Sequence, residues 1–239
     1  MTFDTPCPVC TKPITHEIPD NITGPFRERL FGMAAGVCHE GCFKIRNAQQ
    51  MKVEQAAKEE ARLANWCAIC PPAYQNSESA LIPDQAAHEQ VLKWEFGAKG
   101  LMLFGPTGRG KTRSMFMLLR QQFEQFKSVL YFSHTDFSGR VISMMNDRRA
   151  ADRWLALLVR VDVLFIDDLG KSKFITNDGG AKHSEEILFD VFEKRIGQKL
   201  PTMFTSNFDG RTLQEQMSPD RGEPFIRRLR EFNAGLRFK

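Results

Sequence analysis

LMLFGPTGRGKT, residues 101–112, is the most informative segment of this 239-residue chain. Its last eight residues fit the pattern G-x-x-x-x-G-K-[ST], after an apolar strand-like run and before a segment of helix formers. In this context the backbone N–H groups of a glycine-rich turn and the start of a helix bind phosphates. The segment therefore predicts an ATP-binding phosphate loop made by Gly105, Pro106, Thr107, Gly108, Arg109, Gly110, Lys111 and Thr112.

The last two residues of the loop have side chains suited to nucleotide chemistry. Lys111 is expected to reach the β- and γ-phosphates, and Thr112 to place its hydroxyl on Mg²⁺. The alternative is a glycine-rich turn that only resembles the motif. The strand-like run before the loop and the helical segment after it favour the phosphate loop.

A second apolar run, VDVLFIDDLG at residues 161–170, ends in two adjacent acids. A buried central strand delivers such carboxylates to the edge of a parallel sheet that carries the phosphate loop. We therefore expect Asp167 to bind magnesium and the nucleotide, and Asp168 to polarise the attacking water as a general base. A helix cap or a solvated turn is the alternative for two acids at a strand end.

After Gly100 the chain alternates short apolar runs with helical segments, which is typical of a parallel sheet covered by helices on both faces. Crossover helices are expected at residues 111–126 and 184–196, and a further helix at about 84–96. The predicted fold class is α/β, with five parallel strands at residues 101–104, 129–133, 161–167, 202–206 and 236–238.

Two later segments carry further polar candidates. TMFTSN, residues 202–207, ends in Asn207, whose amide is suited to hold the attacking water or the γ-phosphate. Alone, an Asn at a strand end is more often a turn residue. EPFIRRLREF, residues 223–232, places Arg227, Arg228 and Arg230 on an expected helix, and such a cluster is by default a solvated basic face.

Taken in order, GPTGRGKT, VLFIDDLG, KLPTMFTSN and PFIRRL resemble the nucleotide motifs of AAA+ ATPases of the initiator clade. Within that clade they resemble the DnaC/IstB-like group of helicase loaders and transposition helper ATPases. The likeness covers about residues 66–232 and includes CPPAYQNS, residues 70–77, which is similar to the group's PP-x-[YF] element. It implies a P-loop AAA+ fold of the ASCE type.

The resemblance also implies roles for individual residues. Lys111 and Thr112 match the Walker A motif, and Asp167 and Asp168 match Walker B. Asn207 matches sensor 1. Arg228 matches the arginine finger, which in that group reaches the nucleotide of a neighbouring subunit, so it implies self-association with Arg228 acting in trans. Arg227 stands where a small residue is usual and is an open alternative. Because such a finger contributes about 10³–10⁵ to the hydrolysis rate, the monomer is expected to be a poor ATPase.

The first 42 residues are rich in Cys, Pro and Gly and lack long apolar periodicity. Cys7 and Cys10 form a C-x₂-C pair, and VCHEGC at residues 37–42 supplies a second pair. His39 with Cys42 resembles the H-x₂-C-F of treble-clef fingers, and Cys38 is the alternate to His39. The segment predicts a structural Zn²⁺ site made by Cys7, Cys10, His39 and Cys42.

Residues 43–66 contain no Gly or Pro and predict a solvated connecting helix. The expected division is a zinc-binding, treble-clef-like module at 1–42, this helix at 43–66, and an AAA+ ATPase domain at 67–239. A further C-x₂-C pair, Cys67 and Cys70, has no second pair nearby and is expected to pack in the interior.

The composition, 42% hydrophobic and 26% charged, is that of a globular protein in solution. The chain contains no apolar run of about 18 residues to span a bilayer, and its start lacks the features of a secretory signal. We therefore expect a cytoplasmic protein without membrane contact, whose six cysteines serve metal binding before disulfides. The net charge of +4 is a weak indication of nucleic acid.

The leading expectation is an ATPase that assembles on the replicative DNA helicase through residues 1–65 and delivers it to single-stranded DNA during replication initiation. Residues 1–65 carry equal numbers of basic and acidic side chains, which favours a protein as their partner. Alternatives are a transposition helper that presents DNA to a transposase, and a nucleotide-dependent adaptor whose working end is the zinc module. Candidate DNA contacts, which are also typical of plain solvated charge, are Lys171, Lys173, Arg148 and Arg149.

Overall fold

The computed structural model describes residues 2–34, 36–37, 39–171 and 179–239. The chain forms two compact units, Met1–Ala64 and Asn65–Lys239, and each is described by itself. Among the helices that the structure describes, none combines the length and the hydropathy needed to cross a lipid bilayer.

The N-terminal unit is built around very few buried side chains. β1 (Thr2–Pro6) pairs antiparallel with β2 (Pro13–Glu17), and α1 (Pro25–Ala34) and the first part of α2 (Glu40–Ile69) follow. Among the described residues of this unit, the buried apolar side chains are Cys7, Ile18 and Ala34. So small an apolar interior needs another source of stability.

The long helix α2 confirms the connecting helix expected at residues 43–66 and extends it by about one turn at each end. It ends before Pro71 and Pro72, where a proline removes a backbone donor and disfavours helical geometry in the residue before it. α2 runs without a break through residues 42 and 66, the two predicted domain boundaries. The compact units divide at one point only, between Ala64 and Asn65, so the predicted three-part division stays a prediction.

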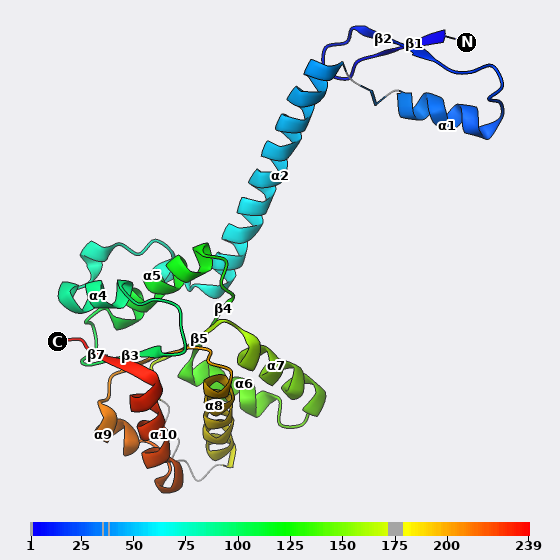
Figure 1. Cartoon of the computed structure of the whole chain (residues 1–239). Helices are drawn as coiled ribbons and strands as arrows, with labels where there is room; N and C mark the ends of the chain where they lie inside the picture. The colour runs from blue at the N-terminus through cyan, green and yellow to red at the C-terminus, as the bar shows by residue number, and fades with distance from the viewer. Residues whose placement is uncertain (1, 35, 38, 172–178) are drawn as a thin grey trace. The chain divides into compact units, whose positions relative to one another are not determined.

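The second unit contains a five-stranded sheet in which all neighbouring strands are parallel (Figure 1). The spatial order is β4-β5-β6-β3-β7. The predicted α/β fold class with five parallel strands is confirmed. The strands are β3 (Gly100–Phe104), β4 (Val129–Ser133), β5 (Val163–Asp167), β6 (Thr202–Ser206) and β7 (Asn233–Arg237).

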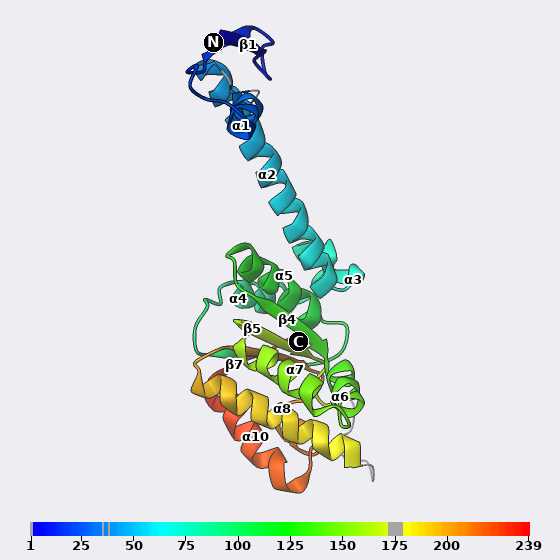
Figure 2. The ribbon, with the colours of Figure 1, turned by 90° about the vertical axis from the view of Figure 1, so that its right-hand side faces the viewer.

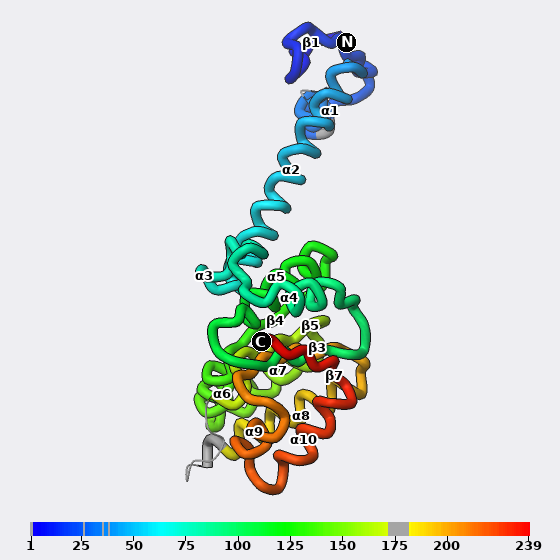
Figure 3. The backbone as a smooth tube through the Cα atoms, turned by 90° about the vertical axis from the view of Figure 1, so that its left-hand side faces the viewer, coloured from blue at the N-terminus to red at the C-terminus, as the bar shows by residue number. Residues whose placement is uncertain are grey.

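Three strands begin at residues other than those predicted, and β3 differs by a single residue, because it begins at Gly100. β5 starts at Val163 because the N–H of Val161 still donates to the carbonyl of Leu157 and closes the preceding helix. β7 starts at Asn233, because it pairs with β3 along its whole length, from Asn233 beside Gly100 onward. Figure 3 shows this last strand next to β3.

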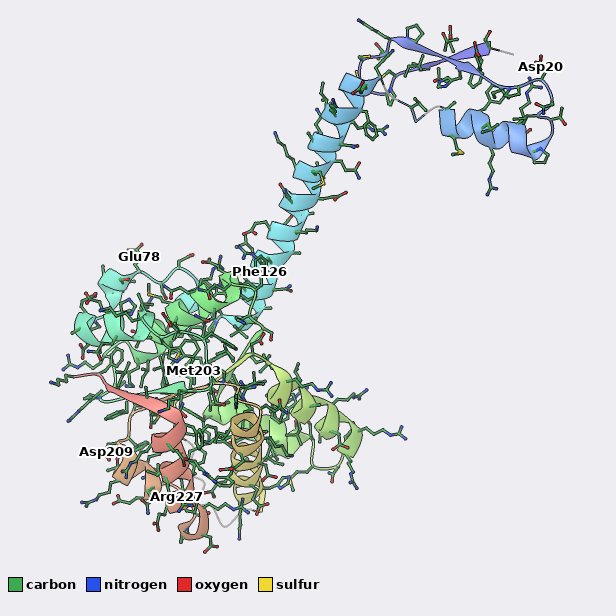
Figure 4. The ribbon with its side chains drawn as sticks, in the orientation of Figure 1. Asp20, Glu78, Phe126, Met203, Asp209 and Arg227 are labelled. Carbon is green, nitrogen blue, oxygen red and sulfur yellow. The ribbon has the colours of Figure 1, made fainter. Side chains whose placement is uncertain are left out.

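Alternate side chains of each strand pack into two separate cores. In β5, Val163 and Phe165 join one core, whereas Leu164 and Ile166 join the other. The end of α2, α4 (Gln85–Leu92) and α5 (Lys111–Glu124) cover the first core, to which Met203 also belongs (Figure 4). Figure 2 shows four helices on the opposite face, α6 (His134–Ser143), α7 (Arg148–Arg160), α8 (Gly179–Gly197) and α10 (Pro219–Phe232). The short α9 (Gly210–Gln214), labelled in Figure 1, packs on the same core through Leu213.

Polar caps define where several helices begin. Asp84, Ser133 and Asp147 each accept a hydrogen bond from the backbone N–H three residues later, at the starts of α4, α6 and α7. Before α4 lie the short α3 (Pro72–Gln75) and the 3-10 turn η1 (Ser79–Leu81). The helices predicted at 84–96, 111–126 and 184–196 are α4, which ends earlier, at Leu92, then α5, and α8, which begins earlier, at Gly179. α5 ends earlier than predicted because Phe126 has a φ of 62°, which a helix does not allow.

Candidate ATP-binding site and candidate zinc site

The phosphate loop lies between the end of β3 and the start of α5. Gly105 has a φ of 138°, and a Cβ at this position would collide with the carbonyl oxygen of Phe238. Gly110 has a φ of 90° and caps α5, and its Cβ would lie 2.8 Å from Cγ2 of Ile82. Glycine is therefore required at both positions. The loop curls over the start of α5, where free N–H groups and the helix dipole favour an anion.

Lys111 joins this loop to the end of β6. Its Nζ donates to the carbonyl oxygens of Gly105 and Pro106, at 2.8 Å each, and to Oδ1 of Asn207 at 2.9 Å. Burial lowers the pKa of Lys111, while two nearby carboxylates act in the opposite direction. The ammonium is thus held by neutral oxygens, which a negatively charged phosphate would displace.

Asp167 is buried at the end of β5. Its Oδ1 accepts hydrogen bonds from Oγ1 of Thr112, at 2.9 Å, and from Oγ1 of Thr205. Burial raises the pKa of Asp167, and the two hydroxyl hydrogen bonds oppose that shift. A carboxylate and an adjacent hydroxyl are the hard oxygen donors that Mg²⁺ prefers, so Thr112 and Asp167 fit the predicted magnesium site.

Asp168 follows directly in the left-handed region, with a φ of 55°. Its backbone N–H donates to Oγ1 of Thr205 at 2.9 Å, and its Oδ2 accepts from Nζ of Lys171 at 2.9 Å. The two acids therefore differ in their surroundings. Asp167 is held in the interior by hydroxyl groups, whereas Asp168 is held by an exposed ammonium.

Two hydroxyl residues of β6, Thr205 and Ser206, also belong to the site, although the sequence motifs predicted no role for them. Thr205 bonds both acids, because its Oγ1 donates to Asp167 and accepts from the N–H of Asp168. Ser206 donates to the carbonyl oxygen of Leu169 at 2.7 Å. Together they fasten β6 to the turn after β5. The signal available in the sequence was TSN, two hydroxyl side chains directly before Asn207.

The arginines of α10 do not join this site. Arg228 donates from Nε to Glu193 of α8 at 2.8 Å and from Nη1 to Glu231 at 3.2 Å. Arg227 is exposed on α10 (Figure 4) and forms no hydrogen bond or ion pair within the part of the chain that the structure describes. The structure thus brings together the phosphate loop, both acids and Asn207. Arg228, on α10, instead forms an ion pair with Glu193 of α8.

The N-terminal unit contains the expected cluster of metal-ligand side chains. The ligand atoms of Cys7, Cys10, His39 and Cys42 all lie within 4.8 Å of one another. Hydrogen bonding, chiefly from the backbone of Cys10, lowers the pKa of Cys7 to about 5, and the neighbouring Cys10 raises that of Cys42 to about 11. Three thiols and one imidazole in this arrangement fit tetrahedral zinc. The alternate ligand, Cys38, lies outside the described residues.

The remaining predicted residues are spread over the surface and interior. Cys70 is buried as expected, whereas Cys67 is exposed, so the expectation of interior packing is wrong for Cys67. Neither belongs to a second ligand cluster among the described residues. Of the candidate DNA contacts, Arg148 and Arg149 are exposed at the start of α7, and Lys171 pairs with Asp168. Lys173 lies outside the described residues.

The family follows from comparison with known proteins. The profile described as "IstB-like ATP binding protein" matches residues 74–216, which include the phosphate loop, both acids and Asn207. The chain belongs to this family. The match covers more than half of the chain and confirms the resemblance to the DnaC/IstB-like group.

Individual relatives agree with this assignment. The replicative helicase loader DnaI of Bacillus subtilis (strain 168) is 27% identical over 126 residues, which are 52% of this chain and 39% of the loader. The chain thus matches well under half of that relative's length. The structure of a DnaC helicase loader has a TM-score of 0.58 at 20% identity, over 71% of this chain and 100% of that one. A DnaI structure has a TM-score of 0.53 at 22% identity, over 65% of this chain and 82% of that one. Both confirm the P-loop fold.

Proposed function

We propose that this chain is an ATPase of the helicase-loader type. It binds ATP with Mg²⁺, assembles on a replicative DNA helicase and delivers the helicase to single-stranded DNA in the cytoplasm. The observation that carries the proposal is the contact between Lys111 and Asn207, which are 96 positions apart. This contact joins the phosphate loop to a second polar strand end, as a site for a nucleotide's terminal phosphates requires.

The residues of the site divide the chemistry among themselves. The backbone N–H groups of residues 105–112 and the Lys111 ammonium would hold the phosphates, and Thr112 with Asp167 would hold the magnesium ion. Magnesium, when bound, neutralises charge on the transferred phosphoryl group. Asp168 accepts a proton from the attacking water, and the Asn207 amide orients that water or the γ-phosphate.

Two substitutions test this division. Lys111→Ala is expected to abolish ATP binding. Asp168→Asn is expected to keep ATP binding and to lower phosphate release by about 10² or more, because a positioned base is removed. Binding is measured by the fluorescence of an ATP analogue and turnover by phosphate release. Asp168→Asn hydrolysing ATP at the wild-type rate would contradict the proposed base.

A second subunit is proposed to complete the site with an arginine of α10. In its own chain Arg228 is bound to Glu193 and Glu231, so it can act in trans only after these ion pairs open. Arg227 is exposed and needs no such change. Arg228 keeps the family's position before Leu229, and we retain it as the proposed finger.

Mixing variant subunits distinguishes Arg228 from Arg227 as the arginine that acts in trans. Arg228→Ala is expected to bind ATP normally and to lose assembly-stimulated hydrolysis. Lys111→Ala subunits, which bind no ATP but keep Arg228, should then restore turnover in the mixture. Normal stimulated turnover of Arg228→Ala together with a loss in Arg227→Ala would reassign the finger to Arg227.

The N-terminal unit is the proposed helicase-binding part. It lies outside the region that matches the family profile, and two of the similar proteins, DnaI of Bacillus subtilis and a DnaC protein, are named as helicase loaders. Its zinc cluster would hold a small folded surface in place. The test is a pull-down of the cognate replicative helicase with the full chain and with Cys10→Ala. The wild type should retain the helicase, and the variant should lose it while still binding ATP.

A transposition helper is the second candidate, favoured by the IstB-like family description. The two functions differ in the partner that stimulates hydrolysis. A loader responds to the replicative helicase, whereas a helper responds to its transposase and to double-stranded DNA. Stimulation by a transposase and none by the helicase would favour the helper.

A further inference from the structure

We propose that Lys171 is a positioning residue that restrains the Asp168 carboxylate, and that a phosphate of single-stranded DNA competes for the Lys171 ammonium and frees Asp168 for hydrolysis. The proposal rests on the proposed function, because it concerns the same base. It adds a direct physical link between DNA binding and ATP turnover.

The geometry of the turn places the two side chains together. Nζ of Lys171 donates to Oδ2 of Asp168 at 2.9 Å, and the backbone N–H of Lys171 donates to the carbonyl oxygen of Asp168 at 3.0 Å. Gly170 between them has a φ of 88°, and a Cβ there would lie 2.8 Å from Cδ1 of Leu213. The turn is therefore packed against α9, and the Lys171 side chain begins next to the base.

The pair restrains the base. A general base must direct an oxygen lone pair at the water it activates. One oxygen of Asp168 already accepts a charge-assisted hydrogen bond from an ammonium that is exposed to solvent. The backbone of Asp168 is held by Thr205 and by Lys171, so release requires only movement of side chains.

The pair is also easy to open. The Lys171 side chain is 64% exposed and that of Asp168 27% exposed, and such ion pairs are weak and screened by salt. Asp167 offers the contrast, because it is buried and held by two hydroxyl groups that carry no charge. Of the two acids, Asp168 is thus the one that an external anion can control.

Single-stranded DNA is the source of that anion favoured by the structure. A lysine is a mobile point charge that binds phosphate, and its exposure makes it reachable by a polyanion from solvent. A phosphate of the bound nucleotide has the same chemistry. However, Lys111 already serves the loop that would hold it, at 2.8 Å from two loop carbonyls.

The test measures ATP turnover of the full chain with and without oligo(dT). The variants are Lys171→Ala and Lys171→Arg, with Lys194→Ala as a control that removes an equal charge from the exposed side of α8. Lys171→Ala should raise kcat without DNA about two- to five-fold, the factor that an exposed ion pair represents, with KM for ATP unchanged. Oligo(dT) should then stimulate it less than the wild type. Lys171→Arg and the control should behave as the wild type does.

The salt dependence of ATP turnover distinguishes this role of Lys171 from a purely structural one. Without DNA, added KCl should raise the turnover of the wild type by screening the pair, and should leave Lys171→Ala unchanged. The affinity for oligo(dT) is measured by fluorescence anisotropy at several KCl concentrations. In Lys171→Ala the slope of log affinity against log salt concentration should decrease by the equivalent of about one phosphate contact.

Three results would overturn the proposal. They are an unchanged or lower kcat in Lys171→Ala, an unchanged response of this variant to oligo(dT), and equal salt slopes of DNA binding for variant and wild type. Failure of the proposed ATPase function would give a different result, because the wild type would then hydrolyse ATP no faster than Lys111→Ala. The DNA-binding slopes would still test the contact of Lys171 with DNA.

Discussion

The two units of this chain are stabilised by different means. The unit Asn65–Lys239 buries two apolar cores, one on each face of its sheet. The unit Met1–Ala64 buries three apolar side chains among its described residues and carries a four-ligand cluster instead. A small module without a core commonly takes its stability from a metal, so the two units should fail independently and under different conditions.

The largest effect is expected from breaking the cluster. Cys42→Ala should abolish zinc binding and unfold the N-terminal unit, because the binding free energy of a structural zinc site is about 10–16 kcal/mol and is also folding free energy. Zinc content and amide hydrogen exchange of residues 2–34 and 39–64 measure this. Cys67→Ala, outside the cluster, is the control and should change neither. Native exchange protection in Cys42→Ala would show that the unit folds without its metal.

The second unit should be broken by removing its buried arginine. Arg195 is fully buried and donates to carbonyl oxygens at 2.6–2.8 Å, those of Leu158, Val161 and Pro201. Arg195→Met should cost about 3–5 kcal/mol, because each buried carbonyl left without a donor costs about 1–3 kcal/mol.

Tryptophan fluorescence in urea measures this effect, since all three tryptophans lie in the second unit. Zinc content should stay that of the wild type. The control is Arg211→Met, where the side chain is 89% exposed. A wild-type unfolding midpoint for Arg195→Met would show that the carbonyls find other donors.

Acid should weaken the second unit through His134. Burial lowers the pKa of His134 to about 4, below its value of about 6.5 in an unfolded chain. Between these values the unfolded state binds the proton and the folded state does not, so stability falls as pH decreases from about 6.5 to 4, by up to about 3 kcal/mol. Urea unfolding at pH 7 and pH 5 measures it. His134→Gln should flatten this dependence, and an equal pH slope in both proteins would exclude His134 as its source.

The smallest effect on stability is expected at the sheet edge that carries the candidate ATP-binding site. Thr205→Val removes a donor to the buried Asp167 and the acceptor of the Asp168 N–H, at a cost of about 1–3 kcal/mol. Turnover should fall at all magnesium concentrations, with ATP binding retained. Thr205→Ser keeps the hydroxyl and is the matched control. Equal turnover of Val and Ser variants would mean that β6 does not position the acids.

Much of the fold could be predicted from the sequence, because its signals are local. The phosphate loop is one contiguous segment, and the runs that became β5 and β6 are apolar throughout because both of their faces are buried. The spacing likewise predicted Cys7, Cys10 and Cys42, and the resemblance to treble-clef fingers favoured His39, which the structure brings to them. The strand ends were less accurate at β7, where pairing with β3 sets the limits.

The contacts that define the site came only from the tertiary structure. Thr205 and Asp167 are 38 positions apart, and they meet because β6 lies beside β5 in the sheet, an order that apolar periodicity does not specify. The ion pair of Arg228 with Glu193 depends in the same way on the packing of α10 against α8. Sequence patterns thus report what one segment does with its own backbone and apolar face. Which polar groups face each other across segments depends on how the strands and helices pack, and only the folded chain decides that.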